Sequence, residues 1–184
     1  MIWEKVGSEN TVDTLKIAIS NCKKHQISHI VVASNTGATV RKALDLDISG
    51  ISIVCVTHHV GFRGPGIDEM SKDERAYLGS CGVKILTTTH VLAGVDRALR
   101  NQYGGIHPPE IIANSLRMLG QGLKVCVEIS IMALDAGLVP HGNQIVAVGG
   151  SSSGADTAAI IVPAHSNNVF DLRVHEILCK PRTW

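Results

Sequence analysis

The sequence has few aromatic residues and almost no net charge. Aromatic side chains make up 3% of the 184 residues, and 17 Lys and Arg stand against 16 Asp and Glu, which leaves a formal net charge of +1. Proteins that bind nucleic acid usually carry a basic surface for the phosphates or aromatic side chains on which bases stack. We therefore expect no nucleic-acid partner.

The sequence also has no long apolar run and no paired cysteines. Its longest apolar runs, such as 51–56 and 158–163, have the length of a strand, and the stretch 123–138 is interrupted by three charged residues, so we expect no membrane span. The N-terminus shows no basic segment leading into an apolar one. The five cysteines are widely spaced and none match a metal motif. We expect a cytoplasmic protein with reduced structural thiols and no metal.

Helical and strand-like hydrophobic patterns alternate along the chain. Helices are predicted at 11–25, 39–46, 72–79, 89–99, 108–119 and 123–136, and strands at 29–33, 51–57, 83–86, 144–148, 158–162 and 172–179. Continuous Val and Ile runs separated by helices are typical of a parallel sheet that is covered on both faces. The last two strands have no helix between them and should form an antiparallel edge. We predict one three-layer α/β/α domain over residues 1–184.

Two features of this predicted fold suggest self-association. The C-terminal hairpin leaves a sheet edge, and the helix at 123–136 carries more apolar surface than a small monomer readily hides. We expect a homo-oligomer, most simply a dimer.

Ligands of such sheets bind at the carboxyl ends of the strands, where the winding reverses. The turn 34–39 offers hydroxyls, a glycine and the start of a helix, whose free N–H groups favour an anion. The loop 149–154 offers flexible backbone and three more hydroxyls. Neither matches the P-loop or the dinucleotide fingerprint, and both could simply cap a helix or close a turn. We predict strand 29–33 beside strand 144–148, which would bring the two loops together.

The candidate ligand-binding residues all lie at or just after a predicted strand end. They are Ser34, Asn35, Thr36, Gly37, Ala38, Thr39, Thr57, His58, Gly61, Phe62, Gly149, Gly150, Ser151, Ser152, Ser153, Gly154, Asp156 and Thr157.

Several nearby side chains have roles that the sequence leaves open. Arg41 and Lys42, in the first turns of the helix after the first loop, can screen a bound anion. His58 and His59 could act as acid, base or ligand contact, or could be ordinary surface histidines. Glu128 lies in the most apolar helix, either paired with Lys124 or with a partner elsewhere.

The two ends of the chain resemble the C-terminal α/β domain of pyruvate kinase. The strand 29–33, the turn 34–39 and a next strand that ends in Val56-Thr57 match its pattern. Near the C-terminus, the segment 142–150, a Ser/Gly loop and the segment 168–174 resemble its terminal strand, Gly-rich loop and closing hairpin. The resemblance departs in the loop 58–70 and the helices at 108–136. The sequence also resembles small stand-alone archaeal proteins made of this domain.

The resemblance carries functional implications of its own. In the full-length kinase the matching turn and loop hold a phosphorylated effector, and catalysis takes place in a separate barrel, for which 184 residues leave no room. We therefore expect no pyruvate kinase activity from this chain by itself. In the stand-alone family the pocket is associated with flavin mononucleotide (FMN). The resemblance thus implies a phosphorylated ligand, with FMN favoured and a flavin-dependent oxidoreductase of unknown substrate as one activity. A sensor domain for a sugar phosphate or nucleotide, and an interaction module without a ligand, are the alternatives.

Overall fold

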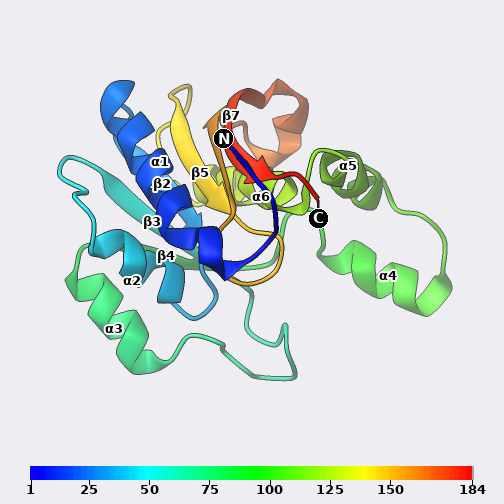
Figure 1. The fold of residues 1–184 in the computed structure, drawn as a ribbon. Helices are drawn as coiled ribbons and strands as arrows, with labels where there is room; N and C mark the ends of the chain where they lie inside the picture. The colour runs from blue at the N-terminus through cyan, green and yellow to red at the C-terminus, as the bar shows by residue number, and fades with distance from the viewer. Residues whose placement is uncertain (184) are drawn as a thin grey trace.

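The computed structural model describes residues 1–183 and is built around one seven-stranded sheet (Figure 1). The strand order is β1-β7-β6-β5-β2-β3-β4. The strands are β1 (Ile2–Trp3), β2 (His29–Ala33), β3 (Ser52–Thr57), β4 (Lys84–Thr87), β5 (Ile145–Gly149), β6 (Thr157–Val162) and β7 (Arg173–Pro181). The helices are α1 (Thr11–Lys24), α2 (Ala38–Leu44), α3 (Lys72–Ser80), α4 (Val95–Tyr103), α5 (Pro108–Arg117) and α6 (Gln121–Asp135), with short 3-10 segments η1 (Ser8–Asn10) and η2 (Ser166–Asp171).

The centre of the sheet is parallel, as its buried Val and Ile runs predict. β2 pairs in parallel with β3 on one side and with β5 on the other, with Ile30 opposite Val146 and Val32 opposite Val148. The predicted pairing of the strand 29–33 (β2) with the strand 144–148 (β5) is therefore confirmed. β6 and β7 run antiparallel, also as predicted. The hairpin is not the outermost element, however, because β1 adds to β7 in parallel.

Helices cover both faces of the sheet, which confirms the predicted three-layer α/β fold. One core lies under α1, α2 and α3 and includes Leu15, Val40 and Leu78. The other lies under α6 and includes Ile131 and Ala147. The chain changes faces between β4 and β5, so the winding reverses where β2 lies beside β5. Ligands of open α/β sheets bind at such a point.

The capping box predicted at the start of α3 is only half formed. The Ser71 hydroxyl accepts a hydrogen bond from the Glu74 N–H at 3.1 Å, as the capping pattern predicts. The Glu74 carboxylate does not complete the capping box, because it pairs with the Arg41 guanidinium on α2.

The predicted helix at 89–99 is wrong in its boundaries, since α4 covers Val95–Tyr103. Gly94 adopts a non-helical backbone, with φ −104° and ψ −120°. Upstream, the Leu92 N–H donates to the Glu128 carboxylate at 3.1 Å instead of to a helix carbonyl. The segment before α4 is thus tied to α6 by a tertiary hydrogen bond.

The apolar helix α6 is covered by its own chain. Twelve of its 15 residues are buried, and it packs on β5, β6, β2 and α5. Its apolar surface is therefore not a reason to expect an oligomer. Four of the five cysteines are buried too, and burial raises the pKa of the Cys22 and Cys55 thiols to about 12. Among residues 1–183, no helix is both long and apolar enough to cross a membrane.

Candidate ligand-binding site

A cavity of about 460 Å³ lies at the carboxyl ends of β2, β3 and β5, at the predicted place. Twelve of the candidate residues line it: Ser34, Asn35, Thr36, Ala38, Thr39, Thr57, His58, Gly150, Ser151, Ser152, Ser153 and Gly154. The two loops that the sequence places 110 or more residues apart thus face one another across a single cavity.

The turn after β2 has the geometry of an anion cradle. Gly37 has the left-handed backbone that precedes α2, with φ 88° and ψ −16°. The Ser34 hydroxyl accepts a hydrogen bond from the Thr39 N–H at 3.1 Å and so anchors the first turn of α2. The first N–H groups of a helix have no partner within it, and they favour a negative charge. A side chain at position 37 would be strained, because φ is positive and because its Cβ would lie 2.6 Å from Glu74 Oε1, which would have to move.

Three helix starts meet at the cavity. Ser8 and Thr11 bring the start of α1, Ala38 that of α2 and Gln121 that of α6. The first turns of α2 and α6 contain no acidic residue. Their N-cap residues, Gly37 and Gly120, have no side chain to cap the helix, and within residues 1–183 Ser34 bonds only one of the free N–H groups of α2, that of Thr39. The positive ends of these helix dipoles are therefore available to an anionic group in the cavity.

The loop between β5 and β6 is held in place by a buried carboxylate. Asp156 is fully buried and accepts hydrogen bonds from the N–H groups of Gly7, at 3.3 Å, and Ser151, at 3.2 Å, and from the Thr157 hydroxyl, at 2.9 Å. Among the described residues, the Ser151 hydroxyl oxygen is buried without a hydrogen-bond partner although the residue lines the cavity. Buried hydroxyls are nearly always satisfied, so this one has an unused bond to give to a ligand.

The two neighbouring cations on α2 have different surroundings. Lys42 lines the cavity. Arg41 does not: its guanidinium pairs with Glu74 at 2.6 Å and lies 4.0 Å from the centre of the Tyr77 ring. Of the two cations that could screen a bound anion, the structure thus places Lys42 at the cavity and Arg41 in an ion pair with Glu74.

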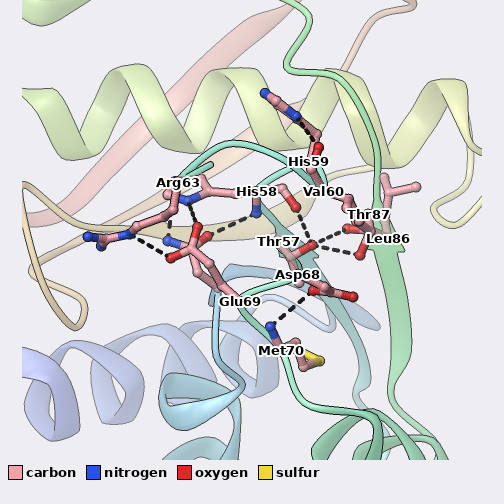
Figure 2. Close-up of polar contacts among 11 residues, drawn as sticks. Thr57, His58, His59, Val60, Arg63, Asp68, Glu69, Met70, Leu86 and Thr87 are labelled. Carbon is pink, nitrogen blue, oxygen red and sulfur yellow. Dashed lines mark hydrogen bonds and ion pairs between the residues drawn. The ribbon is translucent and has the colours of Figure 1, made fainter. Parts of the chain in front are cut away.

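A histidine–carboxylate pair closes another side of the cavity (Figure 2). Glu69 Oε1 lies 2.6 Å from His58 Nδ1, and Arg63 donates to Oε2 of the same carboxylate at 3.0 Å. Burial raises the pKa of the Glu69 carboxyl, but the hydrogen bonds with His58 and Arg63 outweigh it and leave the pKa below its usual value.

The amide of Asn35 determines which His58 nitrogen carries the proton. Asn35 Oδ1 accepts a hydrogen bond from the backbone N–H of His58 at 3.0 Å, and Asn35 Nδ2 lies 3.2 Å from the ring nitrogen Nε2 of His58. Because the amide nitrogen can only donate, Nε2 accepts, and the neutral ring carries its hydrogen on Nδ1 toward Glu69. Through His58, Asn35 in the turn 34–39 is thus linked to Glu69 in the loop after β3.

A second cluster of polar side chains, formed by Glu128, Lys124 and His90, lies at the middle of α6. Glu128 lines the cavity, although only 4% of it is exposed, and it forms an ion pair with the buried Lys124. Burial lowers the pKa of Lys124, against the opposing effect of Glu128. Burial also lowers the pKa of the nearby His90 to about 4, so that this ring is neutral at physiological pH.

Six candidate residues do not line the cavity and have supporting positions instead: Gly37, Gly61, Phe62, Gly149, Asp156 and Thr157. Phe62 stacks on His58 with ring centroids 3.8 Å apart. Gly149 allows α6 to approach β5, since a Cβ there would lie 2.7 Å from the Gly122 carbonyl oxygen. His59 bonds to the adjacent Val60 carbonyl.

Sequence reasoning did not assign several lining residues to the cavity: Ser8, Thr11, Ala33, Val56, Glu69, His90, Gln121, Val125, Glu128 and Ile129. Most of them belong to segments other than the strand-end loops, and only packing brings them there. The spacing of Gln121, Val125, Glu128 and Ile129 along one helical face was a usable signal. Within residues 1–183, no group of three or more His, Cys, Asp or Glu side chains is placed to hold a metal ion.

The family model of the pyruvate kinase α/β domain matches residues 12–161. Because this match spans most of the sequence, the chain belongs to the pyruvate kinase α/β-domain family. The expected resemblance is thereby confirmed.

Solved structures that are similar to this chain include pyruvate kinases of Cryptosporidium parvum. Two of them share 17% sequence identity with it at a TM-score of 0.39; the alignments cover 76% and 80% of this chain and 20% and 22% of the enzyme. A complex of the enzyme with ADP shares 16% identity at a TM-score of 0.39, over 86% of this chain and 24% of the enzyme. The chain therefore spans about a fifth to a quarter of the length of these enzymes.

Proposed function

We propose that the chain binds a phosphorylated small molecule in the cavity between the two loops. The observation that carries this proposal is the convergence of the starts of α1, α2 and α6 on one cavity. Their N–H groups and dipoles favour a phosphate, and Lys42 adds a positive charge. The unpartnered Ser151 hydroxyl supplies a further donor.

The finer proposal is that this ligand is FMN, which the family resemblance favours. The cavity volume of about 460 Å³ lies within the range typical of small-molecule sites. Ala33, Val56, Val125 and Ile129 give it apolar walls against which a ring system can pack, while the hydroxyl-rich loops suit the phosphate. Bound FMN would supply redox chemistry, which is the basis for proposing an oxidoreductase of unknown substrate.

The first test is the spectrum and the native mass of freshly purified protein. A flavin absorbance spectrum and a retained mass equal to that of FMN are expected. A colourless protein that is stabilised against heat by sugar phosphates or nucleotides would instead favour the sensor alternative. A protein that neither retains nor is stabilised by any phosphorylated compound would refute the proposal.

The neighbouring cations on α2 provide a matched pair of variants for the phosphate. Lys42→Ala should weaken binding of inorganic phosphate and FMN, because Lys42 lines the cavity, whereas Arg41→Ala should leave both affinities near wild type. Gly37→Val should abolish binding by displacing the turn. Isothermal titration calorimetry measures all three. Loss of binding in Arg41→Ala with normal binding in Gly37→Val would show that the helix-start cradle is the wrong model.

We also propose a homo-oligomer, now on different grounds. α4 stands away from the sheet (Figure 1), and the α4–α5 region exposes large apolar side chains. Tyr103 is 79% exposed, Ile106 80% and Met118 74%. A nine-residue helix is marginal in water unless its apolar side is covered. Light scattering should give a multiple of the monomer mass for the wild type and for the control Phe170→Glu, and a monomer for Tyr103→Glu. A monomeric wild type at micromolar concentration would contradict the proposal.

A further inference from the structure

The cavity has two chemically different ends, and α6 runs from one to the other. At its start, α6 lies against the first residue of β6 and the end of the β5–β6 loop, since a Cβ on Gly122 would lie 2.0 Å from the Thr157 hydroxyl oxygen and 3.1 Å from Asp156 Oδ1. Further along, Glu128 accepts the Leu92 N–H from the segment after β4. Gln121 and Glu128 both line the cavity and are seven residues apart, which corresponds to about 10 Å along a helix.

The end near the start of α6 is suited to an anion. Ser8, Thr11 and the Ser151–Ser153 loop surround it with hydroxyls. The opposite end carries the carboxylates of Glu69 and Glu128 and the rings of His58 and His90. Arg63 and Lys124 pair with these carboxylates, so within the described residues this end offers hydrogen-bond acceptors but no cation that is free to bind a second phosphate.

We propose that Glu128 is a specificity-determining residue, which accepts a hydrogen bond from an N–H or O–H group at the end of the ligand opposite its phosphate. Its Oε1 accepts from the Leu92 N–H and its Oε2 pairs with Lys124, and each carboxylate oxygen has a further lone pair. These two partners hold the carboxylate in one orientation beside the cavity. Glu69 is held in the same way, with Oε1 bonded to His58 and Oε2 to Arg63.

The ligand class follows from this arrangement and rests on the proposed function. It is the phosphate monoester of a molecule whose far end, about 10 Å from the phosphate, is a ring that donates a hydrogen bond. The imide N–H of the FMN ring system has this chemistry. We expect compounds with an anionic group at both ends to bind more weakly, because the second anion would stand where Glu128 needs a hydrogen-bond donor.

Glu128→Gln tests the inference, because the amide keeps the shape and an acceptor oxygen but loses the charge. We expect FMN to bind about tenfold more weakly, as for loss of a hydrogen bond to a charged group, while the affinity for inorganic phosphate is unchanged. Glucose 1,6-bisphosphate should gain affinity relative to glucose 6-phosphate, because Lys124 then lacks its anionic partner. Ser130→Ala is the control: it changes a buried polar group of α6 whose hydroxyl bonds only to the Cys126 carbonyl in the described structure, outside the cavity lining.

Each outcome of these titrations is decisive. Wild-type affinity for FMN in Glu128→Gln, or a parallel loss of phosphate and FMN binding, would overturn the inference, the second by showing a merely structural role. If Glu128→Gln fails to fold, the double variant Lys124→Met/Glu128→Met replaces the buried pair with apolar side chains of similar size and is titrated instead. It should bind phosphate normally and FMN weakly. A wild-type protein that binds none of the four probes would refute the proposed function itself.

Discussion

The neutral His90 ring makes the folded protein sensitive to mild acid. Burial lowers the pKa of His90 from 6.5 to about 4, although Glu128 works in the opposite direction. Between these two values the unfolded chain takes up a proton that the folded chain does not, so stability falls as the pH drops through this window and is unaffected above it. Linkage gives a loss of about 2 kcal/mol between pH 8 and pH 5. Because the ring is not fully buried, solvent screening reduces the expected value to about 1–2 kcal/mol.

Urea unfolding followed by circular dichroism at pH 8 and pH 5 measures this loss. The wild type should lose about 1–2 kcal/mol more than His90→Gln between the two pH values. His175→Gln removes an exposed histidine and should behave like the wild type. Comparing the pH difference within each variant removes any change in baseline stability. An equal loss in the wild type and in His90→Gln would refute the reasoning.

Three further substitutions test the framework of the site. The Glu69 carboxyl should stabilise the fold above pH 5 and lose this effect toward pH 3, since hydrogen bonds lower its pKa despite burial; Glu69→Gln should flatten that part of the stability profile measured by urea unfolding. Asp156→Asn should cost about 2–3 kcal/mol of unfolding free energy, because an amide nitrogen replaces one of its acceptors; a melting temperature equal to that of the wild type would contradict this. Gly37→Val should lower the melting temperature more than Gly50→Val, because Gly50 has a similar φ but open space around it; equal effects would show that the contact with Glu74 is unimportant.

The sequence by itself determined the order of elements and the place of the cavity. Hydrophobic periodicity depends on neighbours a few positions away, so it predicted α1, β2 and α6 to within a residue or two. The rule that ligands bind at strand ends where the winding reverses then brought the turn 34–39 and the loop 149–154 together. Both inferences use only local patterns and general topology.

Tertiary structure decided which side chains face the cavity, because that depends on contacts between distant segments. Arg41 and Lys42 are adjacent and both cationic, yet Lys42 lines the cavity while Arg41 pairs with Glu74 on α3. The carboxylate of Glu128 lies beside Leu92, which is 36 residues earlier in the sequence. The three helix starts meet through the packing of α1, α2 and α6 on opposite faces of one sheet, a relation that no local pattern in the sequence contains.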